Sequence, residues 1–297
     1  MASGFTIQVI KPNALDPSLR DHLPRHFVYT PGSNPLGKLL LFLGGTTSRP
    51  SNYQNFPAFA AGLGYHVINL SYPNTFSAQV CAEDEDMASF VRFREAVLWG
   101  KPGSNHVQVS PENSIQGRLK ALLHYLVQEA GKKGWANFVD EDGHPQLDRL
   151  VLAGHSQGAG HVAYWAKHQL VPKVLLFAGP NDYSHFHQNA ATWLTQPGIT
   201  PKAHFQGILH RRDEIIPVTQ QLATWQAMGL VKDEGDLGSL EDEYHQEAHS
   251  FWISDREPLA DQVGIAPYHS VMVADSRAVR AGNQAPEMGP IWQRMLQ

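Results

Sequence analysis

A serine between two glycines, in Gly154-His155-Ser156-Gln157-Gly158, is the part of this sequence with the clearest potential for chemistry. The pattern G-x-S-x-G is typical of a sharp strand-to-helix turn that presents a serine hydroxyl as a nucleophile. The residues before it, Arg149 to Ala153 (RLVLA), have the composition of a buried strand, and Gln157 to Gln169 that of a helix. The glycines keep bulky side chains out of the tight turn. We therefore predict that Ser156 is a nucleophile.

In this strand–turn–helix context the motif resembles that of the α/β-hydrolase superfamily, and the resemblance extends roughly from Lys38 to Val273. It points to no characterised subfamily. The resemblance implies a serine, an acid and a histidine in that order along the chain, and no cofactor. A serine in this turn argues against the dehalogenase and epoxide-hydrolase branches, which carry aspartate there. The expected activity is cleavage of a carboxylic ester or a related acyl compound through an acyl-enzyme.

The order of the three groups places the acid after Ser156. Asp213 follows an expected strand at Lys202 to Leu209 and begins the segment Asp213-Glu214-Ile215-Ile216-Pro217. That segment is similar to the D-x-x-[VI]-P pattern around the triad aspartate of many family members. Asp182, after the previous strand, is the alternative, because some lipases of the family place the acid there. Either aspartate is also compatible with a turn residue that caps its own loop. Asp213 is the preferred acid.

The histidines that follow Asp213 are His245, His249 and His269. His269 lies in Pro267-Tyr268-His269-Ser270-Val271, which resembles the histidine loop of the family. His249 is expected inside a strand from Ala248 to Ser254 and His245 just before it, so both are expected to be structural. An imidazole with an ordinary pKa of about 6.5 can take the serine proton and return it to the leaving group. We predict His269 as the base.

Two backbone N–H groups are expected to stabilise the oxyanion, the negative charge that develops on the substrate's carbonyl oxygen when the serine attacks. One belongs to Gln157, directly after the nucleophile, and the other to the turn after an expected strand at Lys38 to Leu43. Aligning Gly44-Gly45 with the His-Gly of the family selects Thr46, whereas a shift of one residue would select Gly45. A glycine turn that serves only the backbone is the other interpretation. The loss of one such donor typically costs about 2.7 to 4 kcal/mol.

These residues need a sheet to position them, and the sequence predicts one. Short apolar runs alternate with helical stretches almost from end to end, which is typical of an α/β fold with a mostly parallel sheet covered by helices on both faces. We expect about eight strands, of which Phe5 to Ile10 and Arg25 to Thr30 form an antiparallel edge. A single domain over residues 1–297 is expected, with small lid segments at 78–110 and 180–201. Residues 231–243 are expected to form an acidic loop.

Composition and charge exclude several classes of protein. The 297 residues are 42% hydrophobic and 17% charged, with a net charge of -5, as in ordinary globular proteins. There is no basic block dense enough to follow nucleic acid or an anionic membrane. The apolar run Leu39 to Leu43 is far shorter than a membrane span, and MASGFTIQVI does not resemble a signal peptide. The single cysteine, Cys81, forbids an intrachain disulfide. We expect a cytoplasmic protein that acts on a small molecule.

Other patterns carry less weight. No metal is expected, because the spacing of the histidines at 185, 187, 204 and 210 matches no ligand pattern. Five aromatic residues near the site are candidates either for an apolar pocket or for core: Tyr72, Trp99, Tyr183, Phe186 and Tyr268. The same triad would serve a thioesterase, an amidase or an acyltransferase. A ligand-binding protein on the same scaffold is the non-catalytic alternative.

Overall fold

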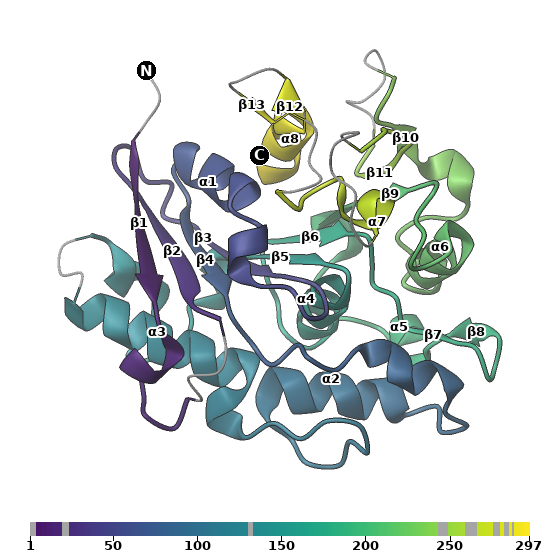
Figure 1. Ribbon diagram of the computed structural model, residues 1–297, viewed down its shortest axis with the longest axis horizontal. Helices are drawn as coiled ribbons and strands as arrows, with labels where there is room; N and C mark the ends of the chain where they lie inside the picture. The colour runs from purple at the N-terminus through teal and green to yellow at the C-terminus, as the bar shows by residue number, and fades with distance from the viewer. Residues whose placement is uncertain are drawn as a thin grey trace.

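A nine-stranded sheet runs through the centre of the computed structural model, which describes residues 4–19, 24–129, 133–242, 249–258, 266–275, 280–281, 285–286 and 288–297 (Figure 1). Its strands, in order across the sheet, are β1 (Phe5–Ile10), β2 (His26–Pro31), β4 (His66–Leu70), β3 (Leu39–Leu43), β5 (Leu150–His155), β6 (Lys173–Phe177), β9 (Phe205–His210), β11 (Phe251–Ser254) and β10 (Gly238–Ser239). Neighbouring strands pair in parallel from β4 to β10 in this spatial order. Strands β1 and β2 form the antiparallel edge, and β2 also pairs antiparallel with β4. The prediction of a mostly parallel α/β sheet is confirmed.

The sheet has nine strands where about eight were expected. Strand β10 lies within residues 231–242, in the segment expected to be a loop, and Gly238 pairs with Trp252 of β11. A strand of two residues shows no alternation of apolar and polar side chains, so the sequence pattern does not reveal it. It forms because β11 offers it an unpaired edge.

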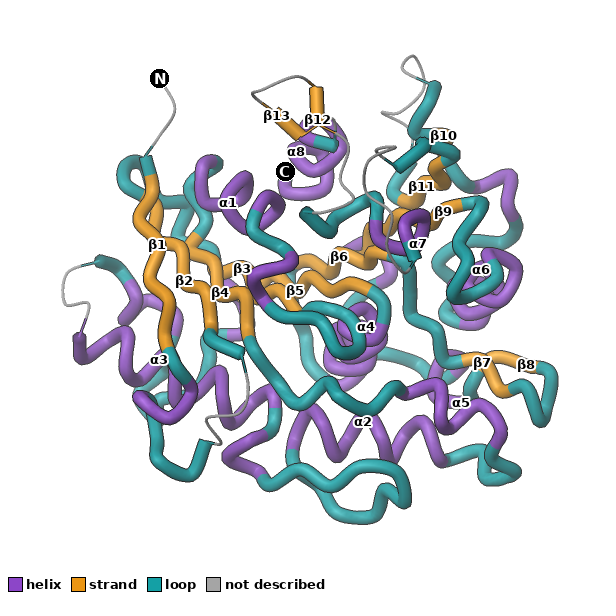
Figure 2. The backbone as a smooth tube through the Cα atoms, viewed as in Figure 1, coloured by secondary structure: helices purple, strands orange, loops and turns teal. Residues whose placement is uncertain are grey.

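Helices cover both faces of the sheet, as Figure 1 shows and as the tube of Figure 2 shows with the strands in orange. One face carries α1 (Asn55–Gly62) and α8 (Gly289–Leu296), and the other carries α2 (Ser89–Trp99), α3 (Ile115–Glu129), α4 (Gln157–His168) and α6 (Val218–Ala227). Strand β3 is buried along its whole length because it lies between these layers. Its alternate residues enter separate cores: Leu41 packs on the α4 side and Phe42 on the α1 side.

The two expected lid segments pack against each other. Residues 78–110 contain the short helix η3 (Ala78–Glu83) and α2, and residues 180–201 contain the hairpin β7 (Tyr183–Ser184) and β8 (Asn189–Ala190) with α5 (Thr192–Thr195). Gln79 donates a hydrogen bond to the carbonyl of Asn181 at 2.7 Å, and the N–H of His185 donates to the carbonyl of Ala82 at 2.8 Å.

The remaining elements lie near the carboxyl end of the chain. A helix of one turn, α7 (Pro267–Ser270), follows the last strand of the sheet, and a separate pair of short strands, β12 (Arg280–Ala281) and β13 (Ala285–Pro286), precedes α8. Among the described residues, no helix is both long enough and apolar enough to cross a bilayer.

Candidate active site

Ser156 occupies the turn between β5 and α4, as its sequence context predicts. Its backbone adopts φ 54° and ψ -118°, a strained conformation for a residue with a Cβ atom. The Ser156 N–H donates a hydrogen bond to the carbonyl of Phe177 at 2.8 Å, which ties the turn to the end of β6. Neighbouring structure therefore stabilises a conformation that the local sequence alone disfavours.

Both glycines of the motif are required by close backbone contacts. A Cβ atom on Gly154 would lie 2.4 Å from the carbonyl carbon of Gly158. A Cβ atom on Gly158 would lie 2.1 Å from the carbonyl oxygen of Leu43, at the end of β3. The pattern thus allows α4 to begin directly against the central strands.

Asp213 and His269 form a buried hydrogen-bonded pair. Oδ2 of Asp213 lies 2.6 Å from Nδ1 of His269, and the side chain of Asp213 is fully buried. Oδ1 accepts hydrogen bonds from the N–H groups of Ile215 and Ile216, both at 2.9 Å, and Oδ2 accepts another from Gln221. Burial alone would raise the pKa of Asp213, but the hydrogen bond and charge of His269, with the two N–H groups, outweigh burial and lower it. Asp213 is therefore held as a carboxylate.

Residues on either side of Asp213 hold the segment that carries His269. The carboxylate of Glu214 accepts hydrogen bonds from the backbone N–H groups of Tyr268 and His269, at 3.1 and 3.0 Å. The guanidinium of Arg212 lies over the ring of Tyr268, 4.6 Å from its centroid. Three consecutive residues after β9 therefore hold two consecutive residues of α7.

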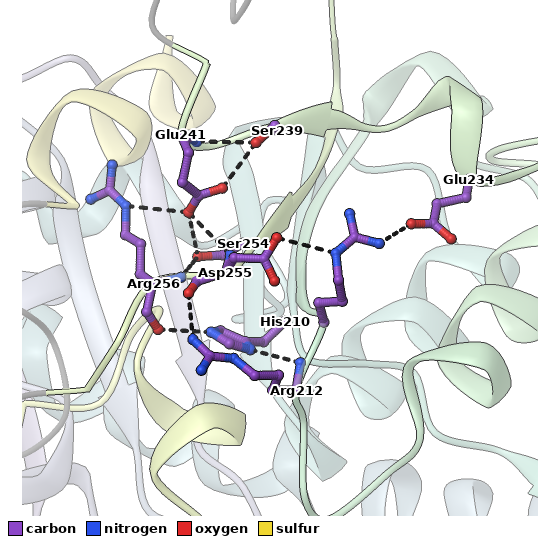
Figure 3. A network of polar contacts seen from close by, with 9 residues as sticks. His210, Arg212, Glu234, Ser239, Glu241, Ser254, Asp255 and Arg256 are labelled. Atoms are coloured by element: carbon purple, nitrogen blue, oxygen red, sulfur yellow. Dashed lines mark hydrogen bonds and ion pairs between the residues drawn. The ribbon is translucent and has the colours of Figure 1, made fainter.

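A polar network at the ends of β9 and β11 anchors Arg212 (Figure 3). Arg212 donates to the carbonyl of Asp255 at 2.6 Å. The ring of His210 bridges the carbonyl of Arg256 at 2.9 Å and the N–H of Arg212 at 3.1 Å. His210 is buried, and burial lowers its pKa, so its ring is neutral. Nε2 donates to the carbonyl of Arg256, and Nδ1 accepts from the N–H of Arg212. The network fixes where the Asp213 loop leaves the sheet.

A second chain of hydrogen bonds joins the turn that carries Ser156 to His269. His155 Nε2 lies 2.9 Å from the carbonyl of His269, and His155 Nδ1 lies 2.9 Å from the hydroxyl of Tyr53. A carbonyl can only accept, so Nε2 carries the proton and Nδ1 accepts from Tyr53. The Tyr53 oxygen accepts in turn from the N–H of Gly45 at 3.2 Å. Burial, aided by the neighbouring His269, lowers the pKa of His155 to about 3, so its ring stays neutral.

The same contacts distinguish the two candidates for the oxyanion turn. The N–H of Gly45 is occupied by Tyr53, whereas the N–H groups of Thr46 and Gln157 have no hydrogen bond to any described residue. The side chains of Thr46 and Gln157 are joined by a hydrogen bond of 2.9 Å. The N–H of Gln157 is free because it begins α4, where the first N–H groups lack partners within the helix. Thr46 therefore remains the better candidate.

Ser156 and His269 line one cavity of about 450 Å³, together with Thr46 and Gln157. Within the described structure, no hydrogen bond joins the Ser156 hydroxyl to His269. Catalytic hydrogen bonds are often long before substrate binds, and proton transfer requires an approach to about 2.6–3.2 Å.

The walls of this cavity are mostly small or polar. Of the two alternatives left open for the five aromatic residues, the structure does not support the apolar pocket, because none of them lines this cavity. Tyr72 is buried with its hydroxyl on the carbonyl of Gly44, and Phe186 is exposed on the β7–β8 hairpin. Sequence position near a loop does not determine which way a side chain points.

Asp182, the alternative acid, lies in a different ion pair. Its carboxylate is fully buried against the guanidinium of Arg94 from α2 and accepts a hydrogen bond from the indole of Trp193 at 2.8 Å. Arg94 also donates to the carbonyl of Gln157 at 2.9 Å. Asp182 thus supports the start of α4, while Asp213 contacts the histidine.

The other histidines considered as bases lie elsewhere. The expectation that His249 lies inside a strand is wrong, because β11 begins at Phe251. The His249 ring lies 3.1 Å from the carbonyl of Asp236, near the beginning of β11 and away from its carboxyl end. His245 falls outside the described residues.

Potential metal ligands gather at one place in the described part of the chain. The ligand atoms of Cys81, Asp84 and His106 lie within 4.8 Å of one another. Nε2 of His106 contacts Oδ2 of Asp84 directly at 2.6 Å, and that oxygen also accepts from Ser89. Burial raises the pKa of the Cys81 thiol to about 11, which disfavours the thiolate that a metal needs. The four histidines considered from the sequence bind separate partners: Glu83, Glu85, Val171 and Arg256.

Comparison with known proteins adds no identification. The chain matches no known protein family and no curated protein sequence.

Sequence reasoning missed Tyr53, His155 and Glu214 as parts of the site. The proximity of His155 to Ser156 and of Glu214 to Asp213 was a usable signal, whereas Tyr53 lies 102 positions from its partner His155.

Proposed function

We propose that this chain is a serine hydrolase with an α/β-hydrolase fold, which cleaves a carboxylic ester or a related acyl compound through an acyl-enzyme. One observation carries the proposal: Ser156, on its strained turn, shares a cavity with His269, whose Nδ1 is held by the buried carboxylate of Asp213. A nucleophile, a base and a group that orients the base are the parts that acyl transfer requires.

In the first half-reaction, the Ser156 oxygen attacks the carbonyl carbon while Nε2 of His269 takes the hydroxyl proton. Asp213 keeps the proton of His269 on Nδ1 and stabilises the imidazolium that forms. The negative charge develops on the carbonyl oxygen, where the N–H groups of Gln157 and Thr46 can donate to it. When the intermediate collapses, the carbon–oxygen bond to the alcohol breaks and His269 returns its proton to the leaving oxygen.

The second half-reaction repeats these steps with water. His269 takes a proton from water as the water oxygen attacks the acyl carbon. Collapse breaks the bond to Ser156, whose oxygen regains a proton from His269, and the acid is released. The cavity is partly open to solvent, so water can reach the acyl group.

The test is covalent labelling with a fluorophosphonate probe. Wild-type protein should label at Ser156, and Ser156→Ala should neither label nor turn over an ester while keeping a nearly unchanged Tm. Ser250→Ala, which removes an exposed serine away from the cavity, is the matched control and should label normally. A folded wild-type protein that neither labels nor hydrolyses any acyl compound would contradict the proposal and favour a ligand-binding role.

Bond type requires a substrate panel. Esters, thioesters and amides with one shared acyl group, assayed with water and with an added alcohol acceptor, separate an esterase from a thioesterase, an amidase or an acyltransferase. Turnover that is highest for the oxygen ester, with acid as the product, is expected.

A further inference from the structure

A second hollow adjoins the catalytic cavity and carries a concentration of positive charge. It encloses about 700 Å³ and is lined in part by Lys11, Arg25 and Arg49. Thr47 and Ser48 line both this hollow and the cavity that contains Ser156. We call it the basic groove. It opens beside the same turn that holds the candidate oxyanion donor Thr46.

The register of the edge strands brings two of these cations together. Ile10 of β1 pairs with His26 of β2, so Lys11 and Arg25 follow directly as the next opposed positions. Like charges placed opposite each other across two strands are destabilising. Arg49, in the loop between the oxyanion turn and the short helix η2 (Pro50–Asn52), is the third cation. All three side chains are exposed and available to a ligand.

Nothing in the described lining of the groove neutralises this charge. None of the described residues that line it is acidic, and none of the three cations forms an ion pair with a described residue. The cluster also opposes the average of the molecule, whose net charge is -5. Three cations that line one hollow, with no acidic group among its described lining residues, suit an anionic ligand group.

The wall between the groove and the cavity is well supported. The side-chain amide of Asn74 donates hydrogen bonds to the carbonyls of Gly45 and Ser48, at 2.7 and 2.9 Å. The backbone carbonyl of Asn74 accepts a hydrogen bond from the N–H of Thr47 at 2.8 Å. These bonds hold the oxyanion turn and the groove wall as one unit. A group bound in the groove would therefore have a defined position relative to Ser156.

We propose that the basic groove binds an anionic group, a carboxylate or a phosphate, of the substrate whose reacting carbonyl lies at Ser156. This proposal rests on the hydrolase function proposed above and specifies its substrate class as an acyl compound with a negative charge away from the reacting bond. Guanidinium groups such as those of Arg25 and Arg49 recognise both anions by paired hydrogen bonds.

Matched substrates test the proposal and show on which side of the scissile bond the charge lies. On the acyl side, the p-nitrophenyl monoester of glutarate is compared with the neutral p-nitrophenyl glutaramate. On the alcohol side, the acetyl ester of 4-hydroxybenzoate is compared with that of 4-hydroxybenzamide. We expect kcat/KM to favour the anionic member of at least one pair by roughly tenfold at low salt, and less at about 0.5 M salt.

Variants assign the preference to the groove. Arg25→Gln and Arg49→Gln should each raise KM for the anionic ester about twofold to fivefold, and the triple variant with Lys11→Gln should remove the preference. The kcat/KM for the neutral partner should fall by a smaller factor than that for the anionic ester. Arg149→Gln, an exposed arginine directly before β5 at the amino-terminal ends of the parallel strands, is the matched control for the loss of charge.

A binding measurement separates this proposal from the proposed function. Inorganic phosphate and succinate are titrated by calorimetry into Ser156→Ala and into the same protein with the three cations replaced by glutamine. If either anion binds to Ser156→Ala but not to the variant that also lacks the three cations, the result would support the groove even without hydrolysis. If wild-type protein hydrolyses esters but shows no charge preference in either pair, the groove proposal is overturned and the hydrolase proposal stands.

Discussion

The ring of His155 donates a hydrogen bond to the backbone carbonyl of His269, with 2.9 Å between Nε2 and the oxygen. His155 is the residue directly before Ser156, so this contact joins the turn of the proposed nucleophile to the segment of the proposed base. The two imidazole rings lie 4.9 Å apart. Small errors in the placement of reacting groups reduce rates strongly. We therefore treat His155 as a positioning residue.

Replacing His155 tests this relationship. His155→Leu should lower kcat by about 10- to 100-fold with little change in KM, because His269 loses a support while substrate contacts remain. His155→Gln, whose amide can donate to the same carbonyl, should recover part of the loss. The measurement is steady-state kinetics on the best ester.

The control for His155 is His204→Leu. The His204 ring also bonds a backbone carbonyl, that of Val171 at 2.8 Å, but it lies at the beginning of β9, away from the cavity. It should keep normal kcat. Equal kcat in His155→Leu and wild type, with both proteins folded, would rule out the positioning role.

Tyr53→Phe removes the hydroxyl that links Gly45 to His155. The N–H of Gly45 and Nδ1 of His155 then lose a partner inside the protein, at about 1–3 kcal/mol each. We expect a lower Tm and a several-fold lower kcat. Tyr65→Phe, which removes a buried hydroxyl bonded to the carbonyl of Leu296, should lower Tm but leave kcat unchanged. A fall in kcat shared by both variants would indicate general destabilisation.

The two aspartates should separate catalysis from stability. Asp213→Asn should lower kcat by up to about 10⁴, because the amide no longer holds His269 in the correct tautomer, and it should leave most of the fold intact. Asp182→Asn should instead cost about 3–5 kcal/mol of stability, because the buried Arg94 loses its counter-charge. Activity assays and denaturant unfolding check the pair. The opposite ranking of activity would transfer the acid role to Asp182.

Stability should fall as the pH drops below the ordinary pKa of histidine. His161 is fully buried between Tyr72 and Phe93, and burial lowers its pKa well below 6.5. Below pH 6.5 the unfolded chain therefore binds a proton that the folded protein cannot, and folding stability declines by up to about 1.4 kcal/mol per pH unit.

His161→Leu removes this group. We compare the free energy of unfolding of His161→Leu with that of wild type at two pH values. The difference, variant minus wild type, should be about 1–2 kcal/mol more positive at pH 5 than at pH 7. The exposed His124→Leu should show no such difference. Denaturant unfolding at the two pH values is the measurement, and a pH-independent difference for His161→Leu would contradict the argument.

The local parts of the site could be predicted from the sequence. Strand composition, a helical stretch and glycines around Ser156 predicted the strained turn, because Cβ atoms at Gly154 and Gly158 would meet backbone within 2.4 Å. The same alternation of apolar runs predicted the parallel sheet, since strands covered on both faces must be apolar throughout. Asp213 and His269 were found by their order and by resemblance, with Asp182 left as an alternative.

The pairing of residues that are distant in the sequence became visible only in the folded protein. Arg94 lies 88 positions before Asp182 in the sequence and forms an ion pair with it. Asp213 forms its hydrogen bond with a histidine 56 positions further along the chain. The Tyr53 hydroxyl and the basic groove likewise depend on segments that touch only after the sheet forms. A local pattern is set by backbone sterics and burial within a few residues. Hydrogen bonds and ion pairs depend on the distance in space between two groups, and the order of residues in the chain does not specify that distance.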